Sequence, residues 1–577
     1  MYRYLTVIIL LFAASCTHSA TVLQASDFSM HANGSDCGPA MQQMLEKAKA
    51  NKKEKCVINI PKGVYHFYPQ SARKVQLHIS NHDQPPYHPV GVPMIGLQNV
   101  TLKANGSTFM FHGLMQPVMV KDSSNTTIRD LHIDYATPYY SEGIFTQTTE
   151  NTTTVRIPEK FRFAVENDRY HNCGEGWKEQ VLSALGFQAD GAMVATGKSG
   201  DVGWNIPAKQ VGERKVEFQI NAKERGFKPG HIMLLRGHSR PHPAMVLDHA
   251  KNTTLRNVYF HSSQGMGLLA QLSRNIRIIG GGCVRGDERV HTVSADATHF
   301  SNCAGKIEVR NALYEGMMDD AINVHSTCLQ ISKVLSPKKI ELKFMHRQAI
   351  GLPLFKKGSR VQYINAATLE NTQRLGTVAA VEYPDEHTVI LTLKQAIPDG
   401  IGAGDAVECA DWYPSVHFHH NTVRHNRARG TLFTTPKQVL VEHNQFIGCS
   451  GSPILLAGDC NGWFESGACR EVIIRHNLFD NNLFCLYQFT EGIISIYPEV
   501  PQLQNQKERY HQNIRIEDNT FRSHRVPLLY AISAANITLR RNTVEWNDRL
   551  PATHGGKPII LHHCDNFVSD NPNLQPQ

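Results

Sequence analysis

Three aspartates stand out because their spacing can bring carboxylates together. Asp319 and Asp320 are adjacent, between a Gly-Met-Met turn and a short expected strand, and Asp296 lies 23 residues before Asp319. Carboxyl groups that lie close to one another raise the pKa of at least one of them, so one becomes an acid and another a base. One acid and one base are what inverting hydrolysis of a glycosidic bond requires, with the carboxyl groups about 6.5–9.5 Å apart.

The spacing of 23 residues recurs as a structural period. The phrase apolar-x-apolar-x-x-Asn occurs at 416–421 and 439–444, and at 514–519 and 537–542, with the asparagines of each pair 23 residues apart. A further copy occupies 472–477. Such units bury alternate side chains and stack as coils, because one coil cannot bury its apolar face alone. The asparagine suits a tight corner, where it tolerates left-handed backbone and its amide can bond neighbouring backbone.

These repeats predict an all-β protein built as a parallel β-helix, with Asp296 and the Asp-Asp pair on neighbouring coils. A leucine-rich horseshoe is excluded because its own spacing of leucine and asparagine is absent. Met41, Met44, Leu45 and Ala48 form the apolar stripe of a helix, and Ile-Pro-Lys-Gly-Val-Tyr follows at 60–65. This opening resembles the pectin-lyase-like enzymes, which implies a right-handed parallel β-helix whose N-terminal helix covers an open sheet edge.

Two regions interrupt the repeats and share a local phrase, at 227–235 and 355–363. We interpret them as two inserted small β-barrel domains. Loops that leave a β-helix from one side usually form the walls of its substrate cleft, so we expect the same of these domains. The expected division is 1–20 signal peptide, 21–140 cap and first coils, 141–249 inserted barrel, 250–331 coils with the aspartates, 332–413 second inserted barrel, and 414–577 C-terminal coils.

The N-terminus and the cysteines predict an exported protein. An apolar run at 5–14 has the length of a signal sequence, and cleavage before Cys16 would resemble the processing of a bacterial lipoprotein. We therefore expect the periplasm or the cell surface, with a lipid on Cys16 as the one link to a membrane. Cys460 and Cys469 are the expected disulfide, and the spacing of the 13 cysteines does not favour a zinc site.

The net charge of +8 is spread along the chain, which indicates a solvated surface and not a nucleic-acid partner. Around the aspartates, Asn323 and His325 alternate with the apolar Ile322 and Val324. Strand periodicity therefore places Asn323 and His325 on the outer face. The candidates for binding sugar hydroxyls are Asn323, His325, His299, Glu315 and Arg429. The alternative is that the Asp-Asp pair only caps a turn.

On these motifs, Ser-Ala-Asp at 294–296 and Met-Asp-Asp-Ala-Ile-Asn-Val-His at 318–325, the chain resembles glycoside hydrolase family 110, the exported α-1,3-galactosidases of gut and marine bacteria. The resemblance covers essentially the whole mature chain. It implies exo-acting release of terminal α-1,3-linked galactose with inversion, from blood group B structures and, in one subfamily, from linear ends. By motif, Asp296 resembles the general acid, and Asp319 and Asp320 the pair that holds and activates the water. No metal or organic cofactor is implied, and the oligomeric state stays open.

Other classes stay open at this stage. A β-helix glycosidase of the polygalacturonase type acting on another sugar is the main alternative, although Ser-Ala-Asp stands where those enzymes have Asn-Thr-Asp. A nearby Arg-Ile-Lys for a galacturonate carboxylate is also absent, which favours a neutral sugar. A calcium-dependent polysaccharide lyase would use the aspartates to bind metal. A surface adhesin would keep the coils but has no need of three carboxylates at one place.

Overall fold

The computed structural model describes residues 20–50, 54–196, 200–203, 205–221, 223–286, 288–485, 487 and 489–576. Residues 1–19, which hold the expected signal sequence and Cys16, lie outside this set. Within it, no helix has both the length and the apolar character needed to cross a membrane.

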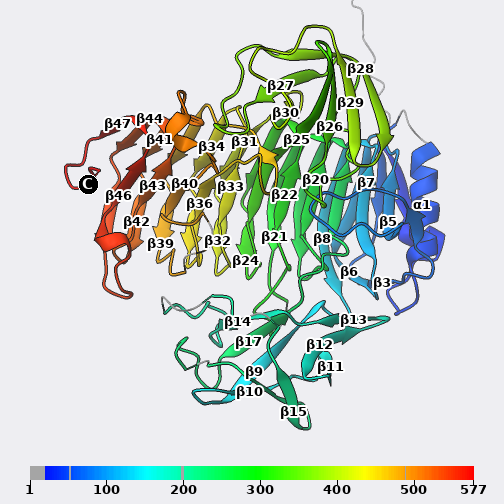
Figure 1. Cartoon of the computed structure of the whole chain (residues 1–577). Helices are drawn as coiled ribbons and strands as arrows, with labels where there is room; N and C mark the ends of the chain where they lie inside the picture. The colour runs from blue at the N-terminus through cyan, green and yellow to red at the C-terminus, as the bar shows by residue number, and fades with distance from the viewer. Residues whose placement is uncertain are drawn as a thin grey trace, which may run out of the picture.

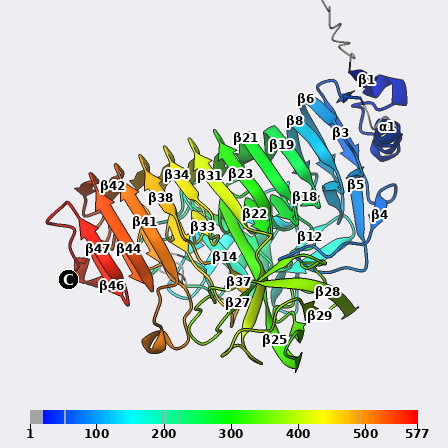
Figure 2. The same ribbon diagram turned by 90° about the horizontal axis from the view of Figure 1, so that it is seen from above.

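The body of the molecule is a parallel β-helix, as the repeats predict (Figures 1 and 2). Each strand of a coil pairs in parallel with the equivalent strand of the next coil, so the coils stack from the N-terminus to the C-terminus. One coil and its successor are β31 (Pro414–His419), β32 (Thr422–Arg424) and β33 (Thr431–Phe433), then β34 (Val439–Glu442), β35 (Gln445–Ile447) and β36 (Ile454–Leu456). The strands that carry the site are β22 (Thr298–Ser301), β25 (Ile322–Ser336) and β33.

The repeated asparagines form a buried ladder along one corner. Asn477 Nδ2 lies 3.0 Å from Asn519 Oδ1, and Asn444 Nδ2 lies 3.0 Å from Asn477 Oδ1. The expected bonds from these amides to backbone are confirmed, for example from Asn477 to Val441 O at 3.0 Å. In this ladder the residue before the asparagine takes the left-handed backbone, as at His476 with φ 53°, whereas in looser copies the asparagine itself takes it as expected, at Asn257 with φ 51° and Asn311 with φ 56°. The tight turn thereby leaves the amide free to point inward.

The helix α1 (Gly38–Ala50) covers the N-terminal end of the coils, where it lies beside β5 (His88–Ile95) in Figure 1. Its predicted apolar stripe is buried in the continuous core that fills the coils. The helix therefore removes an exposed sheet edge, which is a site for unwanted strand pairing.

Inside the C-terminal coils, Phe446, Phe479 and Phe521 stack with centroid separations of 5.3 and 4.9 Å.

Two antiparallel insertions project from the coils, above and below the β-helix in Figure 1. The first contains a six-stranded sheet whose order is β14-β17-β9-β10-β16-β15. Its strands are β9 (Tyr140–Thr148), β10 (Thr153–Arg156), β14 (Ser183–Phe187), β15 (Ala208–Gly212), β16 (Lys215–Phe218) and β17 (Ile232–Arg236), and β11 (Arg162–Glu166), β12 (Arg169–Gly174) and β13 (Trp177–Gln180) form a separate sheet.

The second insertion is a closed barrel, because its strands pair in a ring that returns to β25. Its other strands are β26 (Lys339–Lys343), β27 (Arg360–Ile364), β28 (Gly376–Asp385), β29 (Thr388–Leu393) and β30 (Ala406–Cys409). The first half of β25 belongs to the β-helix, where it pairs with β22 and β33. One continuous strand thus joins the site to the barrel.

Candidate active site

The three aspartates lie at equivalent corners of successive coils. Asp296 precedes β22, Asp319 and Asp320 precede β25, and Arg429 precedes β33. The backbone N–H of Ala297 donates to the Asp320 carbonyl at 2.7 Å, so the first two corners are directly stacked. The period of 23 residues therefore does place the carboxylates together, as expected from the sequence.

The carboxylates form one cluster around an arginine. Asp296, Asp319 and Asp320 bring one oxygen each within 4.8 Å of the others. The guanidinium of Arg429 bridges the adjacent pair, with Nε 3.0 Å from Asp320 Oδ1 and Nη2 3.1 Å from Asp319 Oδ1. This oxygen approach is shorter than the carboxyl separation expected for an inverting enzyme, because all three groups sit at stacked corners about one strand spacing apart.

The three aspartates differ in burial, and burial affects their pKa values. The side chain of Asp320 is 0% exposed, whereas that of Asp319 is 17% exposed. Burial raises the pKa of Asp296 above its usual value, and it raises that of Asp320 well above, against the opposing charge of Arg429. The neighbouring carboxylates in turn raise the pKa of Arg429, against burial, so this cation stays charged. Burial thus favours the protonated form of Asp296 and of Asp320 within the cluster.

A cavity of about 120 Å³ opens at the cluster. Of the residues predicted from sequence, it is lined by Asp296, His299, Asp319, Asn323 and Arg429. Asp320 lies behind this wall and does not line it. Asn323 is buried, and its Oδ1 has no hydrogen-bond partner among the described residues. Its amide is therefore available to a sugar hydroxyl.

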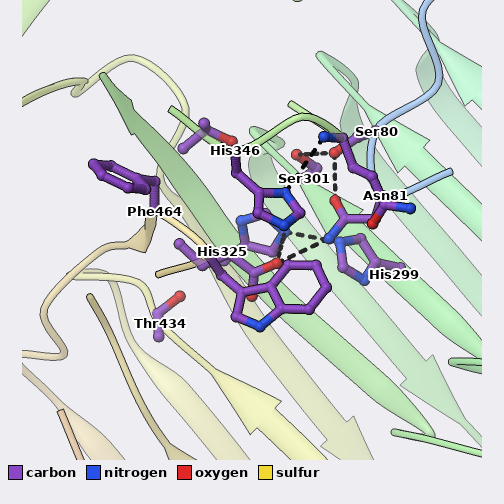
Figure 3. Close-up of polar contacts among 12 residues, drawn as sticks. Ser80, Asn81, His299, Ser301, His325, His346, Thr434 and Phe464 are labelled. Atoms are coloured by element: carbon purple, nitrogen blue, oxygen red, sulfur yellow. Dashed lines mark hydrogen bonds and ion pairs between the residues drawn. The ribbon is translucent and has the colours of Figure 1, made fainter. Parts of the chain in front are cut away.

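Two of the predicted binding residues lie elsewhere. Glu315 ends β24 (Leu313–Glu315) and pairs with Arg424 at 2.7 Å, and it is not among the residues that line the cavity. The Gly-Met-Met turn separates it from the corner that carries Asp319. His325 faces outward from β25 as the alternation predicts, but it is buried under the cavity wall and contacts His299 (Figure 3).

Several functional candidates were missed because they come from distant coils. Asn81, Arg240, Asp459, Trp463, Glu465 and Glu499 line the same cavity. Trp463 is 42% exposed, which is unusual for so large an apolar side chain, and its ring lies against that of His346 with centroids 4.3 Å apart and planes tilted by 35°. Such an exposed ring offers an apolar platform with a polar edge, suited to the face of a sugar.

Among the residues that the structure describes, three sets of side chains bring donor atoms close enough for a cation. They are Asp296 with Asp319 and Asp320, His299 with His325 and Glu465, and Glu308 with His417 and His419. In the first set Arg429 supplies the positive charge. In the second the imidazole nitrogens hydrogen-bond to each other at 2.7 Å. The third lies on the outer side of the coils and away from the cavity.

Comparison with solved structures gives distant similarities. An exopolygalacturonase from Thermotoga maritima covers 95% of this chain and 91% of its own, with a TM-score of 0.40 and 9% sequence identity. The mannuronan C-5 epimerase AlgE4 A-module of Azotobacter vinelandii covers 93% and 99%, with a TM-score of 0.40 and 11% identity. At these scores the similarity carries no argument about function.

Family models and relatives are more specific. Residues 141–233 match the GLAA-B beta-barrel domain I, and residues 339–407 match the GLAA-B beta-barrel domain II. The chain is 45% identical to the alpha-1,3-galactosidase B of Akkermansia muciniphila over 96% of its length and 70% of the relative's. It is 38% identical to an alpha-1,3-galactosidase B of Phocaeicola vulgatus, over 96% and 97%. The chain therefore belongs to this alpha-1,3-galactosidase family of glycoside hydrolases.

Proposed function

We propose that the protein is an exo-acting α-1,3-galactosidase that removes terminal galactose with inversion. The names of the relatives support the sugar and the linkage. The main support from this chain is that Asp296 and Asp319 line one cavity while Arg429 holds Asp319 in place. The proposed acid and the proposed base therefore face the same cavity.

Asp296 is the general acid. Burial favours its protonated form, and protonated carboxyls donate to leaving groups. Its proton goes to the glycosidic oxygen as the bond from the anomeric carbon to that oxygen breaks. The bonding electron pair leaves with the oxygen, which becomes a hydroxyl of the shortened glycan.

Asp319 is the general base. It lines the cavity, where Arg429 Nη2 lies 3.1 Å from its Oδ1, whereas Asp320 is enclosed. A water held by Asp319 bonds to the anomeric carbon and gives its proton to the carboxylate. Asp320 acts on the arginine, which it positions from behind. We thus assign different roles to the two members of the Asp-Asp pair, which the sequence does not distinguish.

The small cavity supports action on a single terminal sugar. Pockets for drug-sized ligands have volumes of about 300–1,000 Å³, and this cavity of about 120 Å³ is smaller. It suits one galactosyl unit better than a run of polymer. The exposed Trp463 supports a platform for the apolar face of galactose, and Asn323 supports recognition of a hydroxyl.

The stereochemical course is the decisive measurement because the close approach of the oxygens does not itself select inversion. The released sugar is followed by proton NMR, with a blood group B oligosaccharide as substrate. We expect β-galactose to appear first and then to mutarotate. Initial α-galactose would refute inversion, and no release from branched or linear α-1,3-galactosyl substrates would refute the assigned activity.

The enzyme acts outside the cytoplasm, in the periplasm or at the cell surface, on α-galactosyl glycoconjugates. Support comes from the apolar run at 5–14 and from Cys16. Fractionation of cells that produce the full chain tests this location. A Cys16→Ser variant should lose membrane association if a lipid is attached there, and unchanged association would refute the lipid.

A further inference from the structure

A row of hydrogen bonds and one ion-pair contact leads away from the assigned acid. Asp296 Oδ2 lies 2.6 Å from His299 Nδ1, and His299 Nε2 lies 2.7 Å from His325 Nε2. Beyond it, His325 Nε2 lies 3.4 Å from Glu465 Oε1, and Asn81 Nδ2 donates to that same oxygen at 2.9 Å. The two rings meet nearly edge to face, at 76° (Figure 3). The three ionisable partners come from separate coils.

One backbone carbonyl fixes the direction of the row. His325 Nδ1 lies 3.0 Å from the carbonyl oxygen of Ser326. A carbonyl oxygen only accepts, so His325 Nδ1 must carry a proton. The protonation of His325 Nε2 then decides every remaining bond, because each neutral imidazole has one donor and one acceptor.

With His325 neutral, its Nε2 accepts from His299 Nε2–H. His299 Nδ1 then carries no proton and can only accept. The proton of Asp296 therefore resides on Oδ2 and is donated to His299 Nδ1. The acidic proton therefore points at the histidine. In this arrangement it is withheld from the glycosidic oxygen.

With His325 protonated, the row reverses. His325 Nε2–H donates to His299 Nε2, so the proton of His299 resides on Nδ1 and is donated to Asp296 Oδ2. The acidic proton of Asp296 then occupies Oδ1, where it can reach the substrate. The adjacent carboxylate of Glu465 supplies the charge that stabilises this cationic state.

We propose that His299, His325 and Glu465 are positioning residues that aim the acidic proton of Asp296 at the leaving oxygen, with protonation of His325 as the control. This inference rests on the proposed role of Asp296 as general acid. It gives His299 and His325 a task other than the binding of sugar hydroxyls.

Other charged groups lie near this row and affect the balance between the neutral and the protonated form of His325. Arg240 and Arg429 lie near Asp296, Asp319 and Arg240 lie near His299, and His82 lies behind it. His346, from the second barrel, lies beside Glu465. The arginines oppose a positive His325, whereas the carboxylates of Glu465 and Asp319 favour it. Glu465 is the one in contact with His325, so its removal should act most directly.

The test compares pH profiles of kcat/KM for two substrates. An α-1,3-galactosyl oligosaccharide has a poor leaving group that needs the acid, whereas α-galactosyl fluoride has a leaving group that needs little protonation. In Glu465→Gln, we expect the basic limb for the oligosaccharide to move about one unit to lower pH, a roughly tenfold loss on that limb. The fluoride should change less than twofold.

Two variants of His325 sharpen the test. His325→Leu removes all hydrogen bonding and should lose at least about tenfold on the oligosaccharide at every pH, with little loss on the fluoride. His325→Gln places an amide donor toward His299 that does not titrate. It should recover part of the lost activity and flatten the basic limb.

His242→Gln serves as the matched control. His242 is also a buried histidine near the cavity wall, but it pairs with His88 at 3.1 Å and has no bond to the row. The basic limb of the kcat/KM profile of His242→Gln should coincide with that of the wild type. Thermal melts establish that each variant is folded.

The outcomes separate the two proposals. If the wild-type enzyme releases galactose from neither substrate, the assigned function is wrong. If it is active but Glu465→Gln leaves the basic limb in place, or if the His325 variants lose both substrates equally, the positioning role is refuted.

Discussion

At the scale of single residues, burial distinguishes two aspartates that are neighbours in sequence. Asp319 reaches the cavity, and Asp320 is fully enclosed behind it. We predict that Asp319→Asn lowers kcat by about 10²–10⁴-fold, the usual contribution of a general base. Asp320→Asn should cost roughly tenfold, because it only loosens Arg429.

Steady-state kinetics on an α-1,3-galactosyl oligosaccharide check this order. Galactose binding to the Asp319→Asn variant, measured by calorimetry, serves as its control for an intact site. A larger loss in Asp320→Asn than in Asp319→Asn would reverse the assignment of the base.

Glu142 makes the stability of the first insertion dependent on pH. Burial raises its pKa to about 7, against the N–H groups of Val290 and His291 that bond its Oε1 at 2.9 and 3.1 Å. Because the folded-state pKa lies above the unfolded one, its stabilising effect is complete below about pH 4.5 and is lost as pH rises through 7. Glu142→Gln should therefore raise the melting temperature at pH 8 relative to wild type. The corresponding gain in the free energy of unfolding is up to about 3 kcal/mol.

The measurement is the difference in melting temperature between Glu142→Gln and wild type at pH 5 and pH 8. The difference should grow with pH. An equal difference at both values would show that Glu142 does not titrate in this range.

At the scale of elements, the asparagine ladder predicts a large cost for one amide. Asn477 bonds Asn444, Asn519 and Val441 O, and it is buried. Asn477→Ala leaves several of these groups unsatisfied and should lower the free energy of unfolding by about 2–4 kcal/mol in urea titrations.

The exposed ladder on the same sheet supplies the control. Asn536 bonds Asn513 at 2.9 Å in solvent and has φ 57°. Asn536→Gly suits that backbone and should cost less than about 1 kcal/mol. Equal costs for both variants would mean that burial of the amide is unimportant.

The expected Cys460–Cys469 disulfide is wrong, because both cysteines are free thiols. Cys460 Sγ lies 3.3 Å from Cys328 Sγ, whereas Cys469 points into the core and donates to Phe433 O at 3.5 Å. Cys469 lies in the irregular segment between β37 (Glu465–Ser466) and β38 (Val472–Arg475), where no periodic pattern predicts which side chains turn inward. Refolding with glutathione disulfide as the oxidant should therefore join Cys328 to Cys460, with both electrons passing to glutathione.

Peptide mapping by mass spectrometry identifies the linked pair. The Cys460→Ser variant is the control and should leave Cys328 as a free thiol. A Cys460–Cys469 peptide, or two free thiols after oxidation, would contradict the predicted Cys328–Cys460 link.

At the scale of the whole molecule, the coils could be predicted from sequence because their signals are local. The asparagine phrase and the alternation around Asn323 report on burial within one strand, and the period of 23 residues relates one coil to the next. The rest of the site depends on contacts between distant segments. Asn81 and Glu465 touch across 384 residues, and no periodic pattern reports such a contact.

A partly buried ion pair is among the contacts that join the first insertion to the segment carrying the site. Asp201 accepts from Arg427 Nε at 2.8 Å and from Arg427 Nη2 at 2.5 Å. Arg427 stands two residues before Arg429, so the insertion holds the loop that positions the base. Burial opposes the charge of Asp201, but Arg427 and Arg236 hold its pKa below its usual value. We predict that Asp201→Asn lowers kcat/KM about tenfold, although this residue is not among those that line the cavity.

The kinetic measurement is paired with a control in the same insertion. Glu166 pairs with Lys178 at 2.7 Å on the exposed surface of the first insertion, away from the coils. Exposed pairs contribute little, so Glu166→Gln should leave kcat/KM unchanged. Activity of Asp201→Asn equal to wild type would mean that Arg429 is positioned by the β-helix alone. A tenfold loss would instead make the insertion part of the catalytic apparatus, which explains why a strong coil scaffold retains so large an interruption beside its active corner.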